Sequence, residues 1–269
     1  SDVCSSDLRM ISRALRKEDE SDAHALARLL RLGELHQVYQ PATDRRALYK
    51  EACHHYFDMR DRQREFKQQI KAKLKRWGQF AIPGQKVYSE DGRAAYLEAL
   101  THDRIRTQVE ALYKLLDEAA RRKQAARQEL IELGQPYPEV QEFKRIPGIG
   151  PIGAHTFDSL IQTPHRFGSK EKLWRYCQLG IRVHQSGDAP GYEQLDPRGL
   201  GELKAVADRA VRSACWRNDQ NEVARSYQRS LQRTGDATNA RLNTERKILA
   251  TMWGLWKSQS AYDPEQFLG

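Results

Sequence analysis

The sequence predicts a mainly α-helical protein, and three observations support this fold class. Charged residues make up 30% of the 269 residues and hydrophobic residues 39%, which is typical of long helices with well-solvated faces. Glycine (17) and proline (10) are too scarce for the many turns of an all-β protein. Apolar residues also recur every three or four positions over long stretches, which is the period of an α-helix.

The first forty residues predict one short helix. Residues 1–8 show neither a helical nor a strand period, and the first methionine is Met10. We therefore interpret residues 1–8 as a non-native leader and exclude them from the fold. A helix begins near Glu18 and ends at Gly33, a suitable C-cap residue. The segment 35–41 alternates and ends in proline, which predicts a strand or an extended connector.

Two long helices are predicted next, over about 43–77 and 91–133. Thr43 or Asp44 can cap the first helix. Both exceed the usual globular length and carry narrow apolar stripes among charged residues, which favours an antiparallel coiled-coil hairpin over 43–134. The stripes are Leu48, Ala52, Tyr56, Met59, Phe66, Ile70 and Leu74, with a lapse at Gln63, and then Tyr96, Leu100, Ile105, Val109, Leu112, Leu116 and Ala119.

A change of composition marks the end of the hairpin. Residues 135–138 read QPYP, and glycine and proline then cluster as far as Gly201. The chain is predicted to be helical again over about 200–257. We therefore predict a separate helical C-terminal domain over 138–269.

The charge of the chain indicates a polyanionic partner. Lys and Arg number 45 against 36 Asp and Glu, a net charge of +9. Nucleic acid is the leading candidate, and a basic protein without such a partner is the alternative. Basic residues are dense over 60–76, where they can follow a phosphate backbone, although such runs are commonly the solvated face of a coiled coil. The candidate nucleic-acid contacts here are Arg60, Arg64, Lys67, Lys71 and Lys75.

Several protein classes are excluded by simple counts. The cysteines, Cys4, Cys53, Cys177 and Cys215, never form a CxxC pair, which argues against zinc-ribbon and thioredoxin-like proteins. No apolar run approaches the roughly 18 residues that span a bilayer, and no secretory signal is recognisable. Scattered thiols fit a reducing compartment, so we expect a cytoplasmic protein without a membrane partner.

The sharpest local motif is residues 145–153, with the sequence RIPGIGPIG. A glycine turn between two helices is typical of the helix-hairpin-helix motif. Gly148 and Gly150 would let a phosphate approach the backbone, and the N–H groups of the next helix would bind it. The alternative is a tight connector between two helices without a ligand.

Two weaker patterns could carry chemistry. Asp19 and Asp22 project to the same side of a helix, and paired carboxylates can hold Mg²⁺, although acids at a helix start more commonly complement its dipole. Ser186 lies beside Gly187 in a polar loop, where a serine nucleophile could be exposed. An ordinary turn is the alternative interpretation of that loop.

A series of short stretches carries a resemblance to a known family. They are residues 19–30, 35–41, 67–72, 146–151, 173–180, 253–257 and 262–264. In this order they resemble the DEDD transposases of the IS-110 insertion-sequence family, over nearly everything after residue 9. The resemblance implies a RuvC-like (RNase H-like α/β) domain, a coiled-coil insertion and a C-terminal transposase domain. Residues 9–42 would then be the end of the RuvC-like domain.

The resemblance also implies a mechanism and partners. Members of this family hold Mg²⁺ with four acids, and Asp19 and Asp22 match the last two. Ser186 matches the family's serine nucleophile, although Gln185 replaces the other serine that often precedes it. The implied partners are DNA, a structured non-coding RNA and further copies of the chain, as a dimer or tetramer.

One departure from the family pattern concerns the metal site. The first aspartate and the glutamate of the set should lie on strands upstream of residue 19, and the sequence predicts no such strands there. We therefore expect an N-terminally truncated chain that is catalytically inactive. Two non-catalytic alternatives remain, namely a nucleic-acid-binding coiled-coil protein with a helix-hairpin-helix and a purely structural coiled-coil scaffold.

Overall fold

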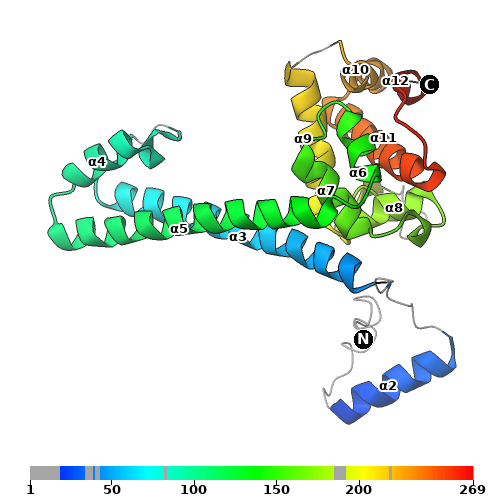
Figure 1. Ribbon diagram of the computed structural model, residues 1–269, viewed down its shortest axis with the longest axis horizontal. Helices are drawn as coiled ribbons and strands as arrows, with labels where there is room; N and C mark the ends of the chain where they lie inside the picture. Colours follow the sequence, from blue (N-terminus) through cyan, green and yellow to red (C-terminus); the bar gives the residue numbers. More distant parts are fainter. Residues whose placement is uncertain are drawn as a thin grey trace. The chain divides into compact units, whose positions relative to one another are not determined.

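The computed structural model describes residues 19–33, 39, 43–81, 84–184, 192–217 and 220–268. The chain divides into two units, Ser1–Ala42 and Thr43–Gly269. Both are helical where they are described (Figure 1), and the two described strands form one small sheet. The mainly α fold is therefore confirmed, whereas the RuvC-like remnant stays a prediction.

In the first unit the described helix is α2 (Asp19–Arg31). Gly33 follows with φ +69°, in the left-handed region that glycine adopts at little cost, and its N–H donates to the carbonyl of Leu30 (3.1 Å). The predicted glycine stop is thus confirmed. Of the predicted extended segment 35–41, Tyr39 alone is described, and the leader 1–8 lies outside the described residues.

The second unit begins with a long helical hairpin. Helix α3 (Asp44–Arg76) is capped by Thr43, whose hydroxyl accepts from the N–H of Arg46 (3.4 Å). Helix α5 (Asp103–Gly134) runs back along it (Figure 1). One apolar cluster joins the start of α3 to the end of α5, and a second joins the end of α3 to the start of α5. The predicted antiparallel pairing over 43–134 is therefore present.

The prediction of one continuous helix over 91–133 is wrong. The chain forms a short turn η1 (Lys86–Tyr88) and helix α4 (Glu90–Glu98), and it then breaks before α5. Leu100, at the break, is buried in the cluster at the hairpin tip. The guanidinium of Arg106 donates to the carbonyls of Leu97 (3.1 Å) and Leu100 (2.7 Å). These bonds satisfy carbonyls that a continued helix would have paired, so they stabilise the break.

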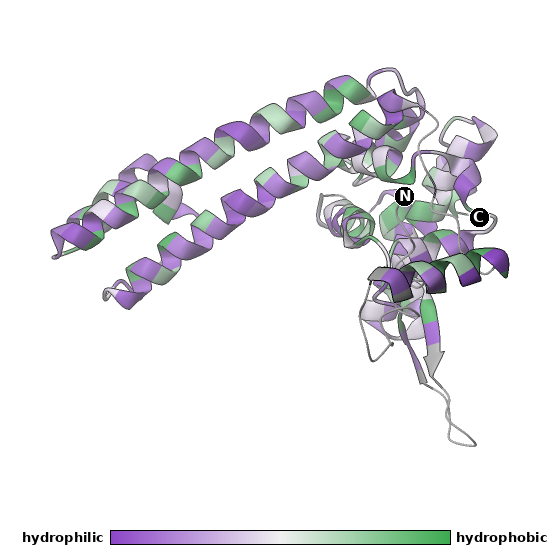
Figure 2. Cartoon of the chain, turned by 90° about the horizontal axis from the view of Figure 1, so that it is seen from below, coloured by the Kyte–Doolittle hydropathy of each residue, from purple (hydrophilic) through white to green (hydrophobic). Residues whose placement is uncertain are grey.

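The predicted stripe on α3 is displaced by one residue at its start. Tyr49 and Cys53 are fully buried, whereas Leu48 is 59% exposed. The lapse at Gln63 also has a physical explanation, because its Oε1 accepts from Lys123 Nζ of α5 (2.6 Å). Figure 2 shows that the two hairpin helices are largely hydrophilic, with hydrophobic residues interspersed along them.

The C-terminal part packs short helices around α7. Every residue of α7 from Ala154 to Ile161 is buried, as expected of a helix enclosed on all sides. Strands β1 and β2 pair antiparallel, with Ile181 opposite Leu195, and extend away from the helices (Figure 2). The elements are α6 (Glu139–Arg145), α7 (Pro151–Ile161), η2 (Pro164–Arg166), α8 (Lys170–Tyr176), β1 (Ile181–His184), β2 (Tyr192–Leu195), α9 (Gly201–Arg217), α10 (Glu222–Thr234), α11 (Ala237–Ser258) and α12 (Pro264–Leu268).

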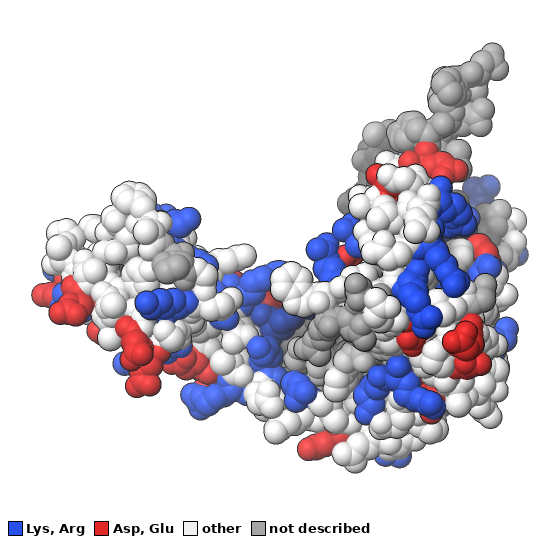
Figure 3. All heavy atoms as spheres, turned by 90° about the horizontal axis from the view of Figure 1, so that it is seen from above, with Lys and Arg blue, Asp and Glu red and all other residues white. Residues whose placement is uncertain are grey.

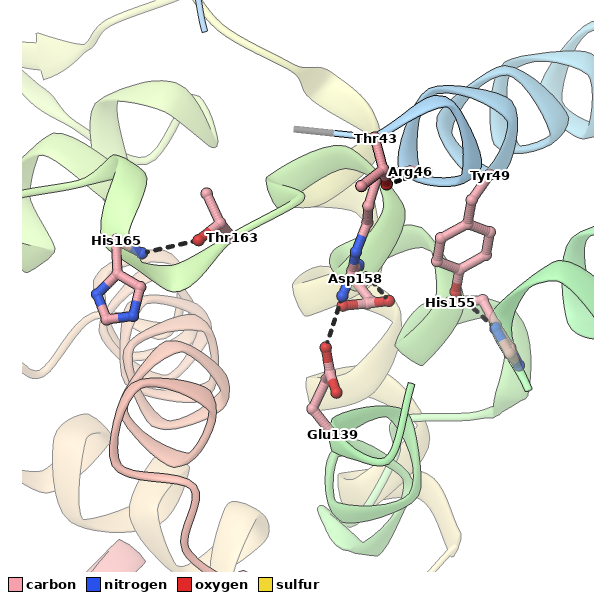
Figure 4. Close-up of polar contacts among 8 residues, drawn as sticks. All are labelled: Thr43, Arg46, Tyr49, Glu139, His155, Asp158, Thr163 and His165. Carbon is pink, nitrogen blue, oxygen red and sulfur yellow. Dashed lines mark hydrogen bonds and ion pairs between the residues drawn. The ribbon is translucent and has the colours of Figure 1, made fainter. Parts of the chain in front are cut away.

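A buried ion-pair cluster, here called the base clamp, joins α3 to α6 and α7 (Figure 4). Arg46 donates from Nη1 to Asp158 Oδ2 (2.9 Å) and from Nη2 to Glu139 Oε1 (2.8 Å). Asp158 is fully buried, and this burial raises its pKa, while the Arg46 charge acts in the opposite direction. The guanidinium also lies 3.5 Å from the ring centre of Tyr137. One cation thus holds two carboxylates from two different helices.

A second buried contact lies one helical turn further along α3. The Tyr49 hydroxyl and His155 Nδ1 are hydrogen-bonded at 2.7 Å (Figure 4). Burial lowers the pKa of His155 to about 4, so the imidazole is neutral near pH 7. Gly134, at the end of α5, leaves the space for this pair, because a Cβ there would come 2.1 Å from His155 Nδ1.

Candidate nucleic-acid interface

The motif at residues 145–153 folds as a helix, a glycine turn and a second helix. Helix α6 ends at Arg145, and α7 begins at Pro151, where a missing N–H costs no hydrogen bond. Gly148 has φ +89°, which disfavours any other residue there. The turn geometry agrees with the sequence expectation, and its use as a DNA-binding helix-hairpin-helix stays a prediction.

The two predicted glycines have different surroundings. A Cβ on Gly148 would lie 2.1 Å from the carbonyl oxygen of Ala210 in α9, so this glycine allows two backbones to pack closely. A Cβ on Gly150 would meet nothing within 4 Å. The close approach at Gly148 is therefore to α9, whereas Gly150 leaves the first turn of α7 open.

A groove of about 770 Å³ lies between this turn, α3 and α9, and we call it the turn groove. Its lining combines buried apolar side chains, such as Phe57 and Val206, with arginines and one highly exposed tryptophan. The lining residues are Tyr56, Phe57 and Arg60 from α3, residues 148–153, and Val206, Arg209, Arg212, Ser213 and Trp216 from α9.

The three arginines of the turn groove differ in their partners. Arg60 Nε pairs with Asp61 (3.0 Å), and Arg212 Nε pairs with Asp208 (2.8 Å), both at the surface. Arg209 has no carboxylate within ion-pair distance among the residues that the structure describes. Burial and the nearby charge of Arg60 lower the pKa of Arg209. An added anion would relieve this repulsion, and exposed ion pairs exchange partners at little cost.

Of the five predicted basic contacts, only Arg60 lines the turn groove. The others follow α3 toward the hairpin tip, and Lys75 lies about 22 Å from Arg60 at 1.5 Å of rise per residue. The Lys67 and Lys71 ammonium groups lie 4.8 and 5.6 Å from the ring centre of Tyr88. Figure 3 shows Lys and Arg side chains over both the hairpin and the C-terminal helices. The residues outside the groove are Arg64, Lys67, Lys71 and Lys75.

The predicted catalytic residues are only partly described. Ser186 lies outside the described residues, in the connection between β1 and β2, and the side chain of Asp19 is not described either. Asp22 is half-buried on α2. Within the described ranges no three His, Cys, Asp or Glu side chains gather as metal ligands. Two carboxylates from one helix turn have the oxygen chemistry that Mg²⁺ prefers, but they supply only part of a ligand set.

The comparison with known families bears on this C-terminal region. Residues 140–228 match the model of the Transposase IS116/IS110/IS902 family. The resemblance to the IS110 transposases is confirmed over these residues. The match spans about a third of the chain, from α6 into α10, and no curated protein matches the chain.

The transposase match includes most of the turn groove. Arg209, Arg212 and Trp216 all fall within the matched IS110 segment, and sequence reasoning missed all three. Their spacing of three and four residues on a predicted helix was the available signal.

In the described part of the chain, no helix has both the length and the apolarity to cross a membrane.

Proposed function

We propose that this chain binds DNA as an IS110-type transposase and that the turn groove contacts the phosphate backbone. The observation that carries the proposal is Arg209, an arginine without a carboxylate partner among the described residues, in a groove within the matched family segment. Arg60 and Arg212 stand beside it, and the open start of α7 adds N–H donors of the kind that bind anions.

We further propose that Ser186 is the nucleophile for strand exchange. Its Oγ would form a bond to a DNA phosphorus, the bond from that phosphorus to a deoxyribose oxygen would break, and the serine proton would leave to a base. Attack by a hydroxyl of another strand would then release the serine, so each broken phosphodiester is replaced by a new one. The support is that Ser186 matches the serine of the resembled family and lies within residues 140–228.

The remaining implied partners are proposals of the same origin. Asp19 and Asp22 would supply two of the carboxylates that hold Mg²⁺, which would stabilise negative charge on the phosphate. A structured non-coding RNA and a dimeric or tetrameric assembly follow from the family resemblance alone. The non-catalytic alternative is a protein that binds nucleic acid through the turn groove and performs no chemistry.

Binding is tested on this chain by fluorescence anisotropy with a labelled DNA duplex over a range of salt concentrations. We expect affinity to fall steeply with salt, and Arg209→Ala to reduce the slope of log affinity against log salt by about 1. The control is Arg62→Ala, because Arg62 is exposed on α3 and does not line the groove. Equal slopes for wild type and Arg209→Ala would refute the role of the groove.

The nucleophile is tested by trapping covalent protein–DNA adducts on denaturing gels, with Mg²⁺ and the DNA of the element. An adduct that Ser186→Ala abolishes, while Ser258→Ala retains it, would support the nucleophile and contradict the predicted inactivity of this chain. Salt-dependent DNA binding without an adduct would agree with the predicted inactivity of this chain as well as with the non-catalytic alternative. An adduct that persists in Ser186→Ala would refute the assignment of the serine.

A further inference from the structure

The most exposed large hydrophobic side chain that the structure describes is Trp216, at 91% exposure. Single exposed apolar residues are common, so exposure alone assigns no role. Trp216, however, lies three and four residues after Ser213 and Arg212, and seven after Arg209. Side chains at this spacing share one face of a helix, so the indole extends a row that begins with two arginines.

The turn groove is lined both by apolar side chains and by groups that can bind a phosphate. Phe57, Ile149 and Val206 are almost fully buried, and each presents an apolar surface to the groove. Contact with such a surface does not stabilise a bound phosphate, whereas it stabilises the planar face of a nucleobase, because apolar area is removed from water. A volume of about 770 Å³ lies within the roughly 300–1,000 Å³ typical of pockets for small organic ligands.

Groups suited to a phosphate lie next to this apolar surface. Arg209 has no carboxylate partner in the described ranges. Gly150 caps α7 without a side chain, and the N–H groups of Ile152 and Gly153 in its first turn have no acceptor within the helix. These donors and three arginines line the same groove as the apolar side chains.

A paired duplex could contact the cationic groups of the groove but not its aromatic and apolar surface. Its bases are stacked on one another, so neither the indole nor the apolar surface could reach a base face. An unpaired nucleotide exposes its base face and its phosphate together, and aromatic side chains bind such bases with little sequence preference. Arginines beside an aromatic ring are the usual companions of this mode of binding.

We propose that the turn groove holds an unpaired nucleotide of a single-stranded nucleic acid, with the base stacked on Trp216 and its phosphate on Arg209. This inference rests on the proposed nucleic-acid binding and adds the class of ligand. It applies to single strands of DNA or RNA, whose shared chemistry is a base next to a phosphodiester.

The test compares binding of a single-stranded oligonucleotide with binding of the duplex of the same sequence, by anisotropy at one fixed salt concentration. We expect Trp216→Ala to weaken single-strand binding roughly 5- to 150-fold, as the loss of one stacked base would, and to leave duplex binding nearly unchanged. Trp216→Phe should restore part of the loss. Trp77→Ala is the matched control, since Trp77 is also exposed but lies outside the groove.

The outcomes separate this inference from the proposal on which it rests. If Trp216→Ala weakens single-strand and duplex binding equally, or weakens neither, stacking is refuted while the DNA-binding proposal stands. If the wild-type chain binds neither oligonucleotide, both proposals fail together. As a second readout, single strands should quench the fluorescence of the wild type more than that of Trp216→Phe, and equal quenching would overturn the inference. DNA and RNA strands tested in parallel show which backbone is preferred.

Discussion

The base clamp offers a sharp test of how the hairpin is attached. In Arg46→Met, the two carboxylates of Asp158 and Glu139 lose their shared cation, and Asp158 is fully buried. Breaking one side of a buried ion pair costs about 3–5 kcal/mol. For a chain of this size, 1 kcal/mol corresponds to about 2–4 °C in the melting midpoint. We therefore expect the midpoint to fall by about 6–20 °C near pH 8.

The pH dependence of this effect has a definite sign. Burial raises the pKa of Asp158, so this group favours folding below its unfolded-state pKa and loses that contribution as pH rises through its folded pKa. Removal of the Arg46 charge raises the pKa further, because that charge holds it down. The fall in the melting midpoint caused by Arg46→Met should thus be smaller at pH 5 than at pH 8.

The assay is thermal melting followed by far-ultraviolet circular dichroism, at both pH values. The double variant Arg46→Met/Asp158→Asn should recover part of the loss at pH 8, because the buried charge is absent. Arg62→Met is the control, since its ion pair with Glu65 is exposed and contributes at most about 1 kcal/mol. A deficit no larger than that of Arg62→Met, or one independent of pH, would refute the reasoning.

Three further predictions concern packing and buried charge. Gly148→Ala should lower the melting midpoint clearly, because its Cβ would lie 2.1 Å from the Ala210 carbonyl oxygen and its φ is +89°. Gly150→Ala should change the midpoint little, because a Cβ there meets open space. Equal effects of the two variants would contradict the packing assigned to the turn. Leu74→Ala should cost about 2–5 kcal/mol in denaturant unfolding and Leu48→Ala much less, since only Leu74 is buried. Equal losses at the two positions would restore the stripe that the sequence predicts, which includes both. Burial, with Asp208 nearby, raises the pKa of Glu245 to about 7, so the stability of the wild type should fall as pH rises from about 5 to 8. Glu245→Gln should be more stable than the wild type at pH 8 and equally stable at pH 5. If stability depends on pH in the same way in both proteins, this carboxyl is not the cause.

The hairpin shows what periodicity can predict and where it fails. The period predicted the long helix α3 and three buried positions of α5, namely Val109, Leu116 and Ala119, because these follow from local sequence. It could not give the break before α5, which depends on the Arg106 side chain reaching two carbonyls of the preceding helix. It also misplaced the start of the α3 stripe, because Tyr49 is buried by its contact with His155, more than one hundred residues away.

The residues of the site also divide into those that local sequence predicts and those that it does not. The glycine turn was predictable because glycine and proline have strong local preferences, and Arg60 was predictable from charge density. Arg209 and Trp216 were missed because their relevance depends on the packing of α9 against the turn at Ala210, which no local pattern reveals. Ser186 and Asp19 were assigned by resemblance, and their side chains lie outside the described residues.

The base clamp and the turn groove share helices α3 and α7. Helix α7 contributes its first turn to the groove, and His155 and Asp158 to the contacts that hold α3. Helix α3 uses Arg46 and Tyr49 for those contacts, and Arg60 reaches the groove about 16 Å beyond Tyr49 along the axis. The distance between Arg60 and the arginines of α9 therefore depends on the angle at which the buried ion pairs hold α3. The contacts of Arg46 and Tyr49 with α6 and α7 thus help to set the position of Arg60 in the groove, in addition to any contribution to stability.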